Sequence, residues 1–169
     1  MKILASVIAG LAVLCSGSEA AAAKLWQQTS TGMTPQQLRH AYPNASGVVL
    51  VDGKEMMTLH PVDLFDVPFR ALFYFSDHRL TEVDLVASSD DPSVFAKEPA
   101  AVAMTLIRDE LTKRYGSAVL STPSKASFLS DGTSIELGFS DTEALLGKGQ
   151  GYQIVTIAYK GADNSENPL

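Results

Sequence analysis

The stretch FRALFYFSDHRLTEVDLV, residues 69–86, has the clearest strand pattern of the chain. In each half, apolar side chains fall on alternate residues, and the side chains of a strand alternate between its two faces. The stretch therefore predicts two half-buried strands, over residues 69–75 and 80–86. The residues on the apolar faces are Phe69, Ala71, Phe73 and Phe75 in the first strand and Val83 and Leu85 in the second.

Matching these apolar faces predicts the register of an antiparallel hairpin. Phe73 then lies opposite Val83, and Ala71 lies opposite Leu85, with a three-residue loop at 77–79. A slip of one residue would place Phe73 opposite Glu82 and turn apolar side chains toward polar ones. The pattern therefore favours the first register.

Further strands are expected on both sides of this hairpin. Residues 47–51 are apolar and mostly β-branched, and the Asp-Gly pair at 52–53 is a strong hairpin turn signal. Residues 55–60 are expected to form the returning strand, and residues 61–68, PVDLFDVP, a connection. Four more strands are expected toward the C-terminus, over residues 117–121, 126–130, 133–139 and 152–160.

Two helices are expected between these strands. Thr34 is a good N-cap, Pro35 suits the first helical position, and Gln37 completes a capping box, which predicts a helix over residues 35–42. A longer amphipathic helix is predicted over residues 99–115. Its wide apolar face is expected to hold Val102, Ala103, Leu106, Ile107 and Leu111.

The order of elements indicates the fold class. The expected order is a helix, a group of strands, a second helix and a second group of strands. Runs of consecutive strands favour antiparallel hairpins over parallel crossovers. We therefore expect an α+β fold, in which an antiparallel sheet carries two helices packed on one face. It would form a single domain over residues 24–160, followed by a polar, flexible tail over residues 161–169.

Composition and charge exclude some classes of function. The chain of 169 residues is 46% hydrophobic and 19% charged, as expected of a globular domain. Its formal net charge is -6 and its isoelectric point is about 4.9. Because an acidic protein repels phosphate backbones, we expect no nucleic-acid partner.

The N-terminus has the pattern of a signal peptide. Lys2 supplies the positive charge, residues 3–15 form an apolar run of the usual length, and residues 18–20 fit the small-x-small cleavage rule. We expect cleavage after Ala20, so that residues 1–20 are removed on export. The apolar run is too short to span a bilayer comfortably, so we expect no membrane span.

The single cysteine, Cys15, lies in this leader. A lipoprotein signal usually has Leu three residues before its lipid-modified Cys, whereas Ala12 stands there, so a lipid anchor at Cys15 is disfavoured. Cleavage after Ala22 or Ala23, the alternatives to Ala20, would also remove the thiol. The mature chain then has no disulfide and no thiolate metal site, and it must rely on its core.

The residues Gly32-Met33-Thr34, with Gln37 and Leu38 after them, resemble the helix opening in two groups of small exported proteins. One is the small lipoprotein of the outer-membrane β-barrel assembly machinery, and the other is the secreted β-lactamase-inhibitory protein. The resemblance implies tandem helix-plus-strands units as an option for the fold. It also implies a periplasmic location in the envelope of a Gram-negative bacterium.

The chain is also similar, over more of its length, to small exported proteobacterial proteins that have no assigned function. They share a Trp near the mature start, here Trp26, a Phe-rich strand, and helix ends such as Tyr-Pro at 42–43 and Tyr-Gly at 115–116. This similarity implies export but no activity. Neither resemblance brings site residues to this chain.

The histidines and acidic residues do not predict catalysis. His78 is expected at a hairpin tip, where exposure neither desolvates nor orients a base, and His60 with Asp63 and Asp66 matches no metal-ligand spacing. No nucleophile–base–orienter set can be assembled. We therefore expect no enzyme activity, no cofactor and no metal. A hydrolase remains the second alternative, and it would be favoured if His60 or His78 were buried beside a carboxylate.

Two carboxylates share the polar face of the second hairpin strand. Glu82 and Asp84 are two residues apart, and Arg70 is expected nearby. Such a pair can act as an acid–base dyad, but exposed charges of both signs more often form a solvated salt-bridge cluster. We adopt the salt-bridge interpretation.

A binding function is the remaining class. Residues 63–67 place apolar side chains, including Leu64 and Phe65, in a connection that can dock a partner, and Trp26 and Tyr42 are expected to form an aromatic anchor beside it. The hypothesis is an exported, non-catalytic protein-binding or accessory module of the cell envelope. A small-molecule or lipid binding protein, with a pocket between sheet and helices, is the alternative.

Overall fold

The structure is a computed structural model that describes residues 22–142, 146 and 151–161. The expected leader with Cys15, and residues 162–169 of the expected tail, lie outside the described residues. The first half of the chain contains α1 (Pro35–Ala41), β1 (Val49–Val51), β2 (Lys54–Leu64), β3 (Val67–Ser76) and β4 (Arg79–Ser88). The second half contains α2 (Ala100–Tyr115), β5 (Leu120–Ser121), β6 (Lys125–Ser130), β7 (Thr133–Asp141) and β8 (Gln153–Gly161).

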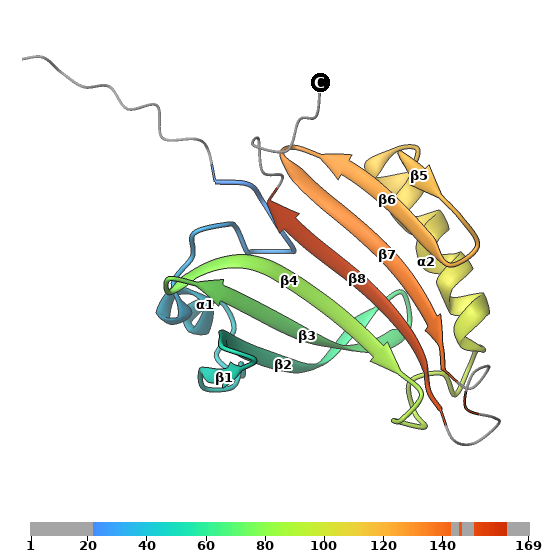
Figure 1. Ribbon diagram of the computed structural model, residues 1–169, viewed down its shortest axis with the longest axis horizontal. Helices are drawn as coiled ribbons and strands as arrows, with labels where there is room; N and C mark the ends of the chain where they lie inside the picture. The colour runs from blue at the N-terminus through green and yellow to red at the C-terminus, as the bar shows by residue number, and fades with distance from the viewer. Residues whose placement is uncertain (1–21, 143–145, 147–150, 162–169) are drawn as a thin grey trace, which may run out of the picture.

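All eight strands form one antiparallel sheet, in the order β1-β2-β3-β4-β8-β7-β6-β5. Each half of the chain is a meander of neighbouring hairpins, and β4 pairs with β8 where the two meanders meet. This pairing runs from Glu82 opposite Lys160 to Ser88 opposite Ile154. Figure 1 shows the two strands side by side in the middle of the sheet.

One face of the sheet carries the core. In β3 the side chains of alternate residues, from Val67 to Phe75, are buried. The same face continues across β4, β8 and β7, where Leu85, Ile157 and Leu137 are fully buried. Because the apolar residues alternate in every one of these strands, the second face of the sheet is left with polar and half-buried side chains.

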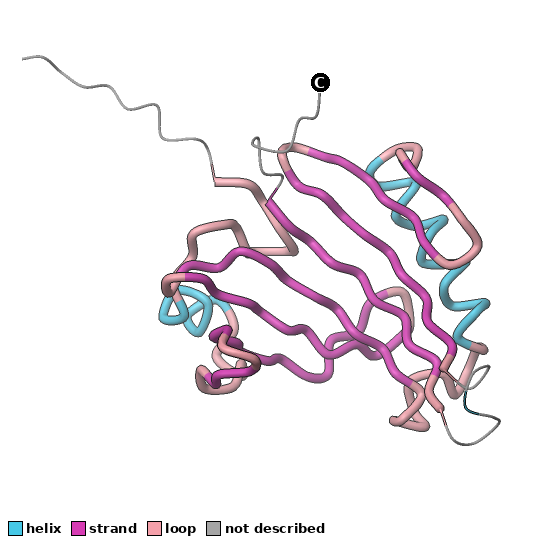
Figure 2. The backbone as a smooth tube through the Cα atoms, in the orientation of Figure 1, coloured by secondary structure: helices cyan, strands magenta, loops and turns pink. Residues whose placement is uncertain are grey.

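The expected fold class is wrong. A single eight-stranded antiparallel sheet dominates the structure, and the two helices do not pack as a layer on one face. α2 packs against β6, β7 and β8, whereas α1 lies beside the other half of the sheet and buries only Leu38 (Figure 1). The tandem units are corrected too, because the strands of both halves merge into one sheet. Figure 2 shows how small a share of the described chain is helical.

The hairpin of β3 and β4 has the predicted register, with Ala71 opposite Leu85 and Phe73 opposite Val83. Its loop differs from the prediction. A register shift after Tyr74 brings Ser76 opposite Arg79, so the turn has two residues rather than three. The bulge absorbs the extra residue and allows the tight two-residue turn that matches the twist of the strands.

The expected connection at 61–68 is also wrong. β2 continues through Pro61 to Leu64, and β3 begins at Val67. The ladder between these strands shifts its register between Leu59 and Val62. Proline lacks a backbone N–H, so inside a sheet it is tolerated only at an edge or at such an irregularity. The sequence pattern does not show where an irregularity lies, and it therefore predicted the end of the strand before Pro61.

Both helices begin and end close to their expected residues, but the apolar face of α2 is narrower than predicted. Ala103, Ile107 and Leu111 are buried as expected, whereas Val102 and Leu106 are exposed. At the C-terminus of the sheet, Gly161 belongs to β8 and not to a tail.

The capping box of α1 is formed as predicted. The Thr34 hydroxyl accepts a hydrogen bond from the backbone N–H of Gln37, and the Thr34 N–H donates to Gln37 Oε1 at 2.8 Å. Directly before it, Gly32 has a φ of +83°, a conformation that glycine adopts without strain. The backbone of Gly32 and Met33 then pairs with Leu80 at the start of β4, which fixes α1 to the sheet.

Candidate functional site

The first two predicted binding residues, Trp26 and Tyr42, lie together in an aromatic cluster. Their rings are stacked, with centroids 5.9 Å apart, and both contact Phe73 of β3. Trp26 is buried and Tyr42 is half-buried against the core. Burial raises the pKa of the Tyr42 hydroxyl, against a smaller opposing contribution from its hydrogen bond with Gln28. The cluster therefore anchors the N-terminal segment to the sheet.

A turn at residues 25–29 holds Trp26 in this cluster. The Thr29 hydroxyl donates a hydrogen bond to the carbonyl oxygen of Trp26 at 2.6 Å and accepts one from its N–H at 3.0 Å. Thr29 is one of the few buried polar residues of the described chain. Both backbone groups of Trp26 are thus satisfied without a partner strand.

The other two predicted residues, Leu64 and Phe65, lie at the turn between β2 and β3. Both are half-buried and pack against the core. Phe73 lies six positions after Val67 in β3, which corresponds to about 20 Å of strand. Trp26 and Tyr42 therefore do not form an anchor beside Leu64 and Phe65, because they occupy the opposite end of the strand.

The turn at Phe65 has an unusual backbone. Leu64 pairs with Val67, which leaves a two-residue hairpin loop, and its residues Phe65 and Asp66 have φ values of +55° and +61°. Such loops favour Asn, Asp or Gly, because a positive φ costs other residues roughly 1–2 kcal/mol. The first residue of the other two-residue turns is Asp, as at Asp52. Phe65 is thus a bulky residue held in a strained conformation.

Phe65 lines a groove between this turn and the start of α2. The groove has a volume of about 510 Å³, and Val94 and Leu106 are among the apolar residues that line it with Phe65. Asp63, Asp66, Glu98 and Lys97 lie at the groove as well, and all four are exposed. None of the four forms an ion pair within the part of the chain that the structure describes. The groove therefore has both apolar and charged residues in its lining, with an excess of negative charge.

Two of the groove's features could not be read from the sequence. Leu106 was expected in the buried face of α2, but it is half-exposed and lines the groove. Phe65 was expected in a longer connection, and only the two-residue turn gives it a positive φ. Both depend on where the tip of the β2–β3 hairpin meets α2.

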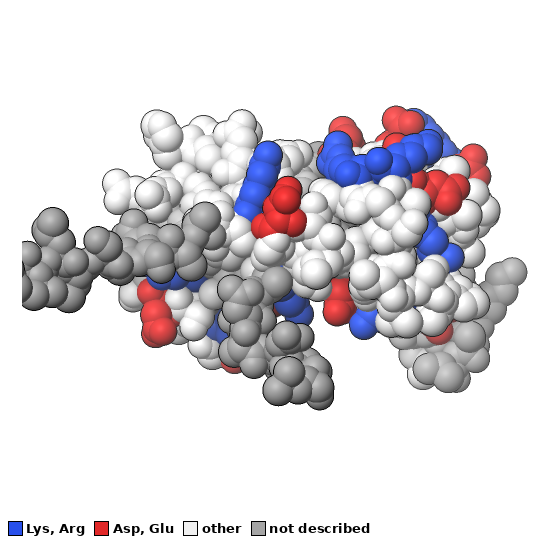
Figure 3. Space-filling model, turned by 90° about the horizontal axis from the view of Figure 1, so that it is seen from above, with Lys and Arg blue, Asp and Glu red and all other residues white. Residues whose placement is uncertain are grey.

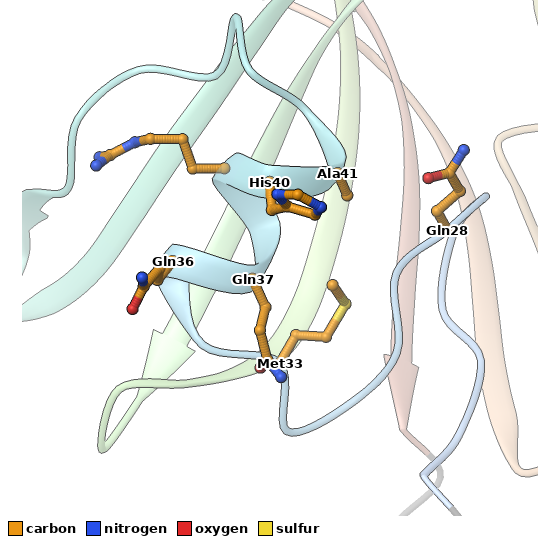
Figure 4. Close-up of a pocket in the computed structure, with 7 residues that line it drawn as sticks. Gln28, Met33, Gln36, Gln37, His40 and Ala41 are labelled. Carbon is orange, nitrogen blue, oxygen red and sulfur yellow. The ribbon is translucent and has the colours of Figure 1, made fainter.

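A larger hollow of about 850 Å³ opens beside α1. Figure 4 shows Gln28 and Met33 across the space from each other, with His40 and Ala41 on the helix above Met33. Its other lining residues are Gln36, Gln37 and Arg39. Because this hollow is wide and its polar side chains are exposed, it neither desolvates nor orients a ligand, and the groove is the better candidate.

The carboxylates Glu82 and Asp84 lie on the uncovered face of the sheet. Glu82 forms an ion pair with Lys160 of β8 at 2.9 Å, and Arg70 faces Val86 instead. Asp84 Oδ1 is buried and makes no hydrogen bond. Burial, and then the negative charge of Glu82, raise the pKa of Asp84 to about 7, despite the positive charges of Lys160 and Lys54.

The interpretation of this pair as a fully solvated cluster is therefore wrong for Asp84. The neighbours of Asp84 across the ladder are Leu72 and Ala158, which shield its carboxyl group from water. Since the pairing of β4 with β8 joins residues far apart in the chain, no local pattern could indicate this environment. The pair can hold one proton near neutral pH.

His60 and His78 do not lie in a cluster of potential catalytic side chains. His78 Nδ1 lies 2.8 Å from the carboxylate of Glu55, but the His78 side chain is 79% exposed. His60 is exposed and its Nδ1 lies 3.4 Å from the carbonyl oxygen of Phe69. Neither histidine is a buried base beside a carboxylate. Within the described residues, no three His, Cys, Asp or Glu side chains are grouped so that they could hold a metal ion.

Comparisons with protein-family models, with curated proteins and with solved structures found no match to the chain. The resemblance of residues 32–38 to the two groups of exported proteins therefore stays a prediction. No helix among the described residues is long and apolar enough to cross a membrane.

Proposed function

We propose that this protein is an exported, periplasmic binding module of the cell envelope, and that its groove docks a protein partner. The segment that enters the groove would carry an apolar side chain flanked by Lys or Arg. The location rests on the signal-peptide pattern of residues 1–20 and on the resemblance at Gly32-Met33-Thr34.

The single observation that carries this proposal is the left-handed backbone of Phe65. Strained residues persist where the surrounding structure holds them, and they cluster at ligand-binding positions. Asn or Gly at this position would form the same turn without the cost. The aromatic ring contributes to the wall of the groove, which gives a reason to retain Phe65 there.

The charges of the groove support the choice of partner. Three carboxylates, of Asp63, Asp66 and Glu98, accompany the single ammonium group of Lys97. Complementary charge favours encounter with a basic segment and disfavours an acidic one. The volume of the groove also suits a small molecule, so an amphipathic organic cation is the alternative ligand.

The test is photo-crosslinking in living cells, with a photoreactive residue in place of Leu106. We expect a crosslink to one envelope protein, and we expect Phe65→Asn or Asp66→Lys to abolish it. Phe65→Asn relieves the strain of the positive φ but also removes the contacts of the ring with the core. Urea unfolding of the variant is therefore measured beside the wild type, and the crosslink is scored only under conditions where the variant is folded. Loss of the crosslink would then not be due to unfolding.

The control places the photoreactive residue at Leu129, which is exposed on β6 and does not line the groove. The same crosslink from both positions, or a Leu106 crosslink that survives Phe65→Asn and Asp66→Lys, would contradict the proposal. If no protein is captured and amphipathic cations raise the melting temperature only when Phe65 is present, the small-molecule alternative is correct.

A further inference from the structure

A second cavity lies on the uncovered face of the sheet, next to the groove. Its volume is about 210 Å³, and it shares Pro68 and Val94 with the lining of the groove. Residues of β3, β4 and β8 that alternate with the buried ones also line it, namely Arg70, Val86, Ser88 and Ile154. Pockets for drug-sized ligands usually have about 300–1,000 Å³, so this cavity suits a smaller molecule.

The basic side chains of this cavity come from β2 and β3. The ladder between these strands shifts its register between Leu59 and Val62, and such a bulge can redirect a side chain. His60 belongs to this irregularity, and it lines the cavity together with Arg70 of β3. The irregular end of β2 therefore supplies a second basic group to the cavity.

Arg70 has no partner among the described residues. Its guanidinium group forms no ion pair and no hydrogen bond with any of them. Other basic side chains do pair with carboxylates, as Lys160 does with Glu82 at 2.9 Å, and Figure 3 shows basic and acidic side chains in mixed groups on one face of the molecule. The donors of Arg70 are therefore available to a ligand, and a guanidinium group can donate two parallel hydrogen bonds to one carboxylate.

Two carboxylates line the same cavity, from the loop after β4. Asp90 is exposed, and Asp91 accepts hydrogen bonds from the backbone N–H of Ser93 at 2.9 Å and from its hydroxyl at 2.6 Å. These hydrogen bonds, and then the positive charges of His60 and Arg70, lower the pKa of Asp91. No ion pair between described residues joins either aspartate to Arg70. Charges of both signs therefore line one cavity without direct contact, and space remains between them.

We propose that this cavity binds the zwitterion of a small apolar amino acid. Arg70 donates hydrogen bonds to the carboxylate of the ligand, and Asp90 and Asp91 accept hydrogen bonds from its ammonium group. A ligand with a single charge is disfavoured, because the aspartates repel an anion and Arg70 repels a cation. The side chain of the amino acid contacts the apolar part of the lining, which consists of Pro68, Val86, Val94 and Ile154.

The test is an NMR titration of the purified, isotope-labelled protein with L-valine. Because water screens exposed charges, we expect saturable binding with a dissociation constant of about 1 mM, and the largest shifts at the backbone amides of Arg70, Val86 and Ser93. Two further probes each remove one charge of the ligand. N-acetyl-L-valine lacks the ammonium group and L-valine methyl ester lacks the carboxylate, and we expect each to bind at least about tenfold more weakly.

Variants of the cavity and matched controls locate the site. Arg70→Gln and Asp90→Asn are each expected to raise the dissociation constant of L-valine about tenfold. Arg39→Gln and Asp63→Asn remove the same charges from the hollow beside α1 and from the groove, and neither residue lines this cavity. We expect no change in these two controls. All four side chains are exposed, so the substitutions are expected to leave the fold intact.

Three results would overturn the proposal. The absence of shifts at about 20 mM L-valine would mean that the cavity does not bind the zwitterion. Equal binding of L-valine and either of the singly charged probes would show that one charge is enough. Binding that survives Arg70→Gln and Asp90→Asn, or that is weakened equally by the two controls, would show that L-valine does not bind in this cavity. None of these results depends on the groove at Phe65.

Discussion

Replacing Asp84 by Asn should stabilise the protein at high pH and not at low pH. The pKa of Asp84 is raised from 3.8 to about 7, chiefly because the folded protein buries its carboxyl group. Between these two values, the native state keeps a proton that the unfolded chain releases. Stability is therefore lost as the pH rises through this window, and the loss is complete above about pH 7.

The magnitude follows from the size of the shift. Each pKa unit corresponds to about 1.4 kcal/mol, so the full shift would correspond to roughly 4 kcal/mol. Asp84 is only half-buried and shares its proton with Glu82, so solvent screening reduces this figure, and we expect about 1–2 kcal/mol. Asn has nearly the same shape as Asp and no charge, so Asp84→Asn should regain this amount at pH 8 and very little at pH 4.

The assay is urea unfolding, followed by circular dichroism at several values between pH 4 and pH 8. Asp91→Asn is the control with the opposite sign, because hydrogen bonds from Ser93 lower the pKa of Asp91. That variant should lose stability at high pH relative to low pH. A stabilisation by Asp84→Asn that is the same at pH 4 and pH 8, or a destabilisation at pH 8, would show that burial does not raise the pKa of Asp84.

Three further predictions concern the N-terminal part of the fold, each measured by urea unfolding. Leu38→Ala should lower the free energy of unfolding by about 2–5 kcal/mol, since Leu38 is the only buried residue of α1. A loss below about 1 kcal/mol would mean that Leu38 does not anchor α1. Thr34→Ala should cost about 1 kcal/mol by removing the capping box with Gln37, whereas equal costs for Thr34→Ala and Thr34→Ser would contradict this role. Thr29→Val should lower the free energy of unfolding by about 1–3 kcal/mol, because it removes the hydrogen bond to the Trp26 carbonyl oxygen. It should also shift the fluorescence of Trp26, the single Trp of the chain. An unchanged spectrum would show that the Thr29 hydroxyl does not hold the ring.

Local patterns predicted the parts of the fold that depend on near neighbours. The alternation of residues 69–86 was enough to pair Ala71 with Leu85 and Phe73 with Val83, because a register error would turn the apolar face toward water. The capping box of Thr34 and Gln37 was likewise predicted by residues three apart. Each of these interactions joins residues that are close together in the chain.

Local patterns predicted only part of the candidate groove. Leu64 and Phe65 were singled out as apolar residues in a connection, but the strained turn at Phe65 appears only when β2 continues past Pro61. The exposure of Leu106 is a second example, since helical periodicity assigns it to the buried face of α2. Periodicity predicts which side of a helix is apolar. It does not show how much of that side the neighbouring elements cover.

Near-neighbour patterns were enough for the register of the β3–β4 hairpin, the Asp-Gly turn at 52–53 and the capping box of α1, because side-chain alternation and turn chemistry act between residues close in the chain. The pairing of β4 with β8, which joins the two halves of the chain into one sheet, depends on tertiary contacts that no local pattern predicts. The same pairing decided the raised pKa of Asp84. These outcomes depend on contacts between segments about seventy residues apart, whose loop-closure cost is recovered only when the whole core is buried.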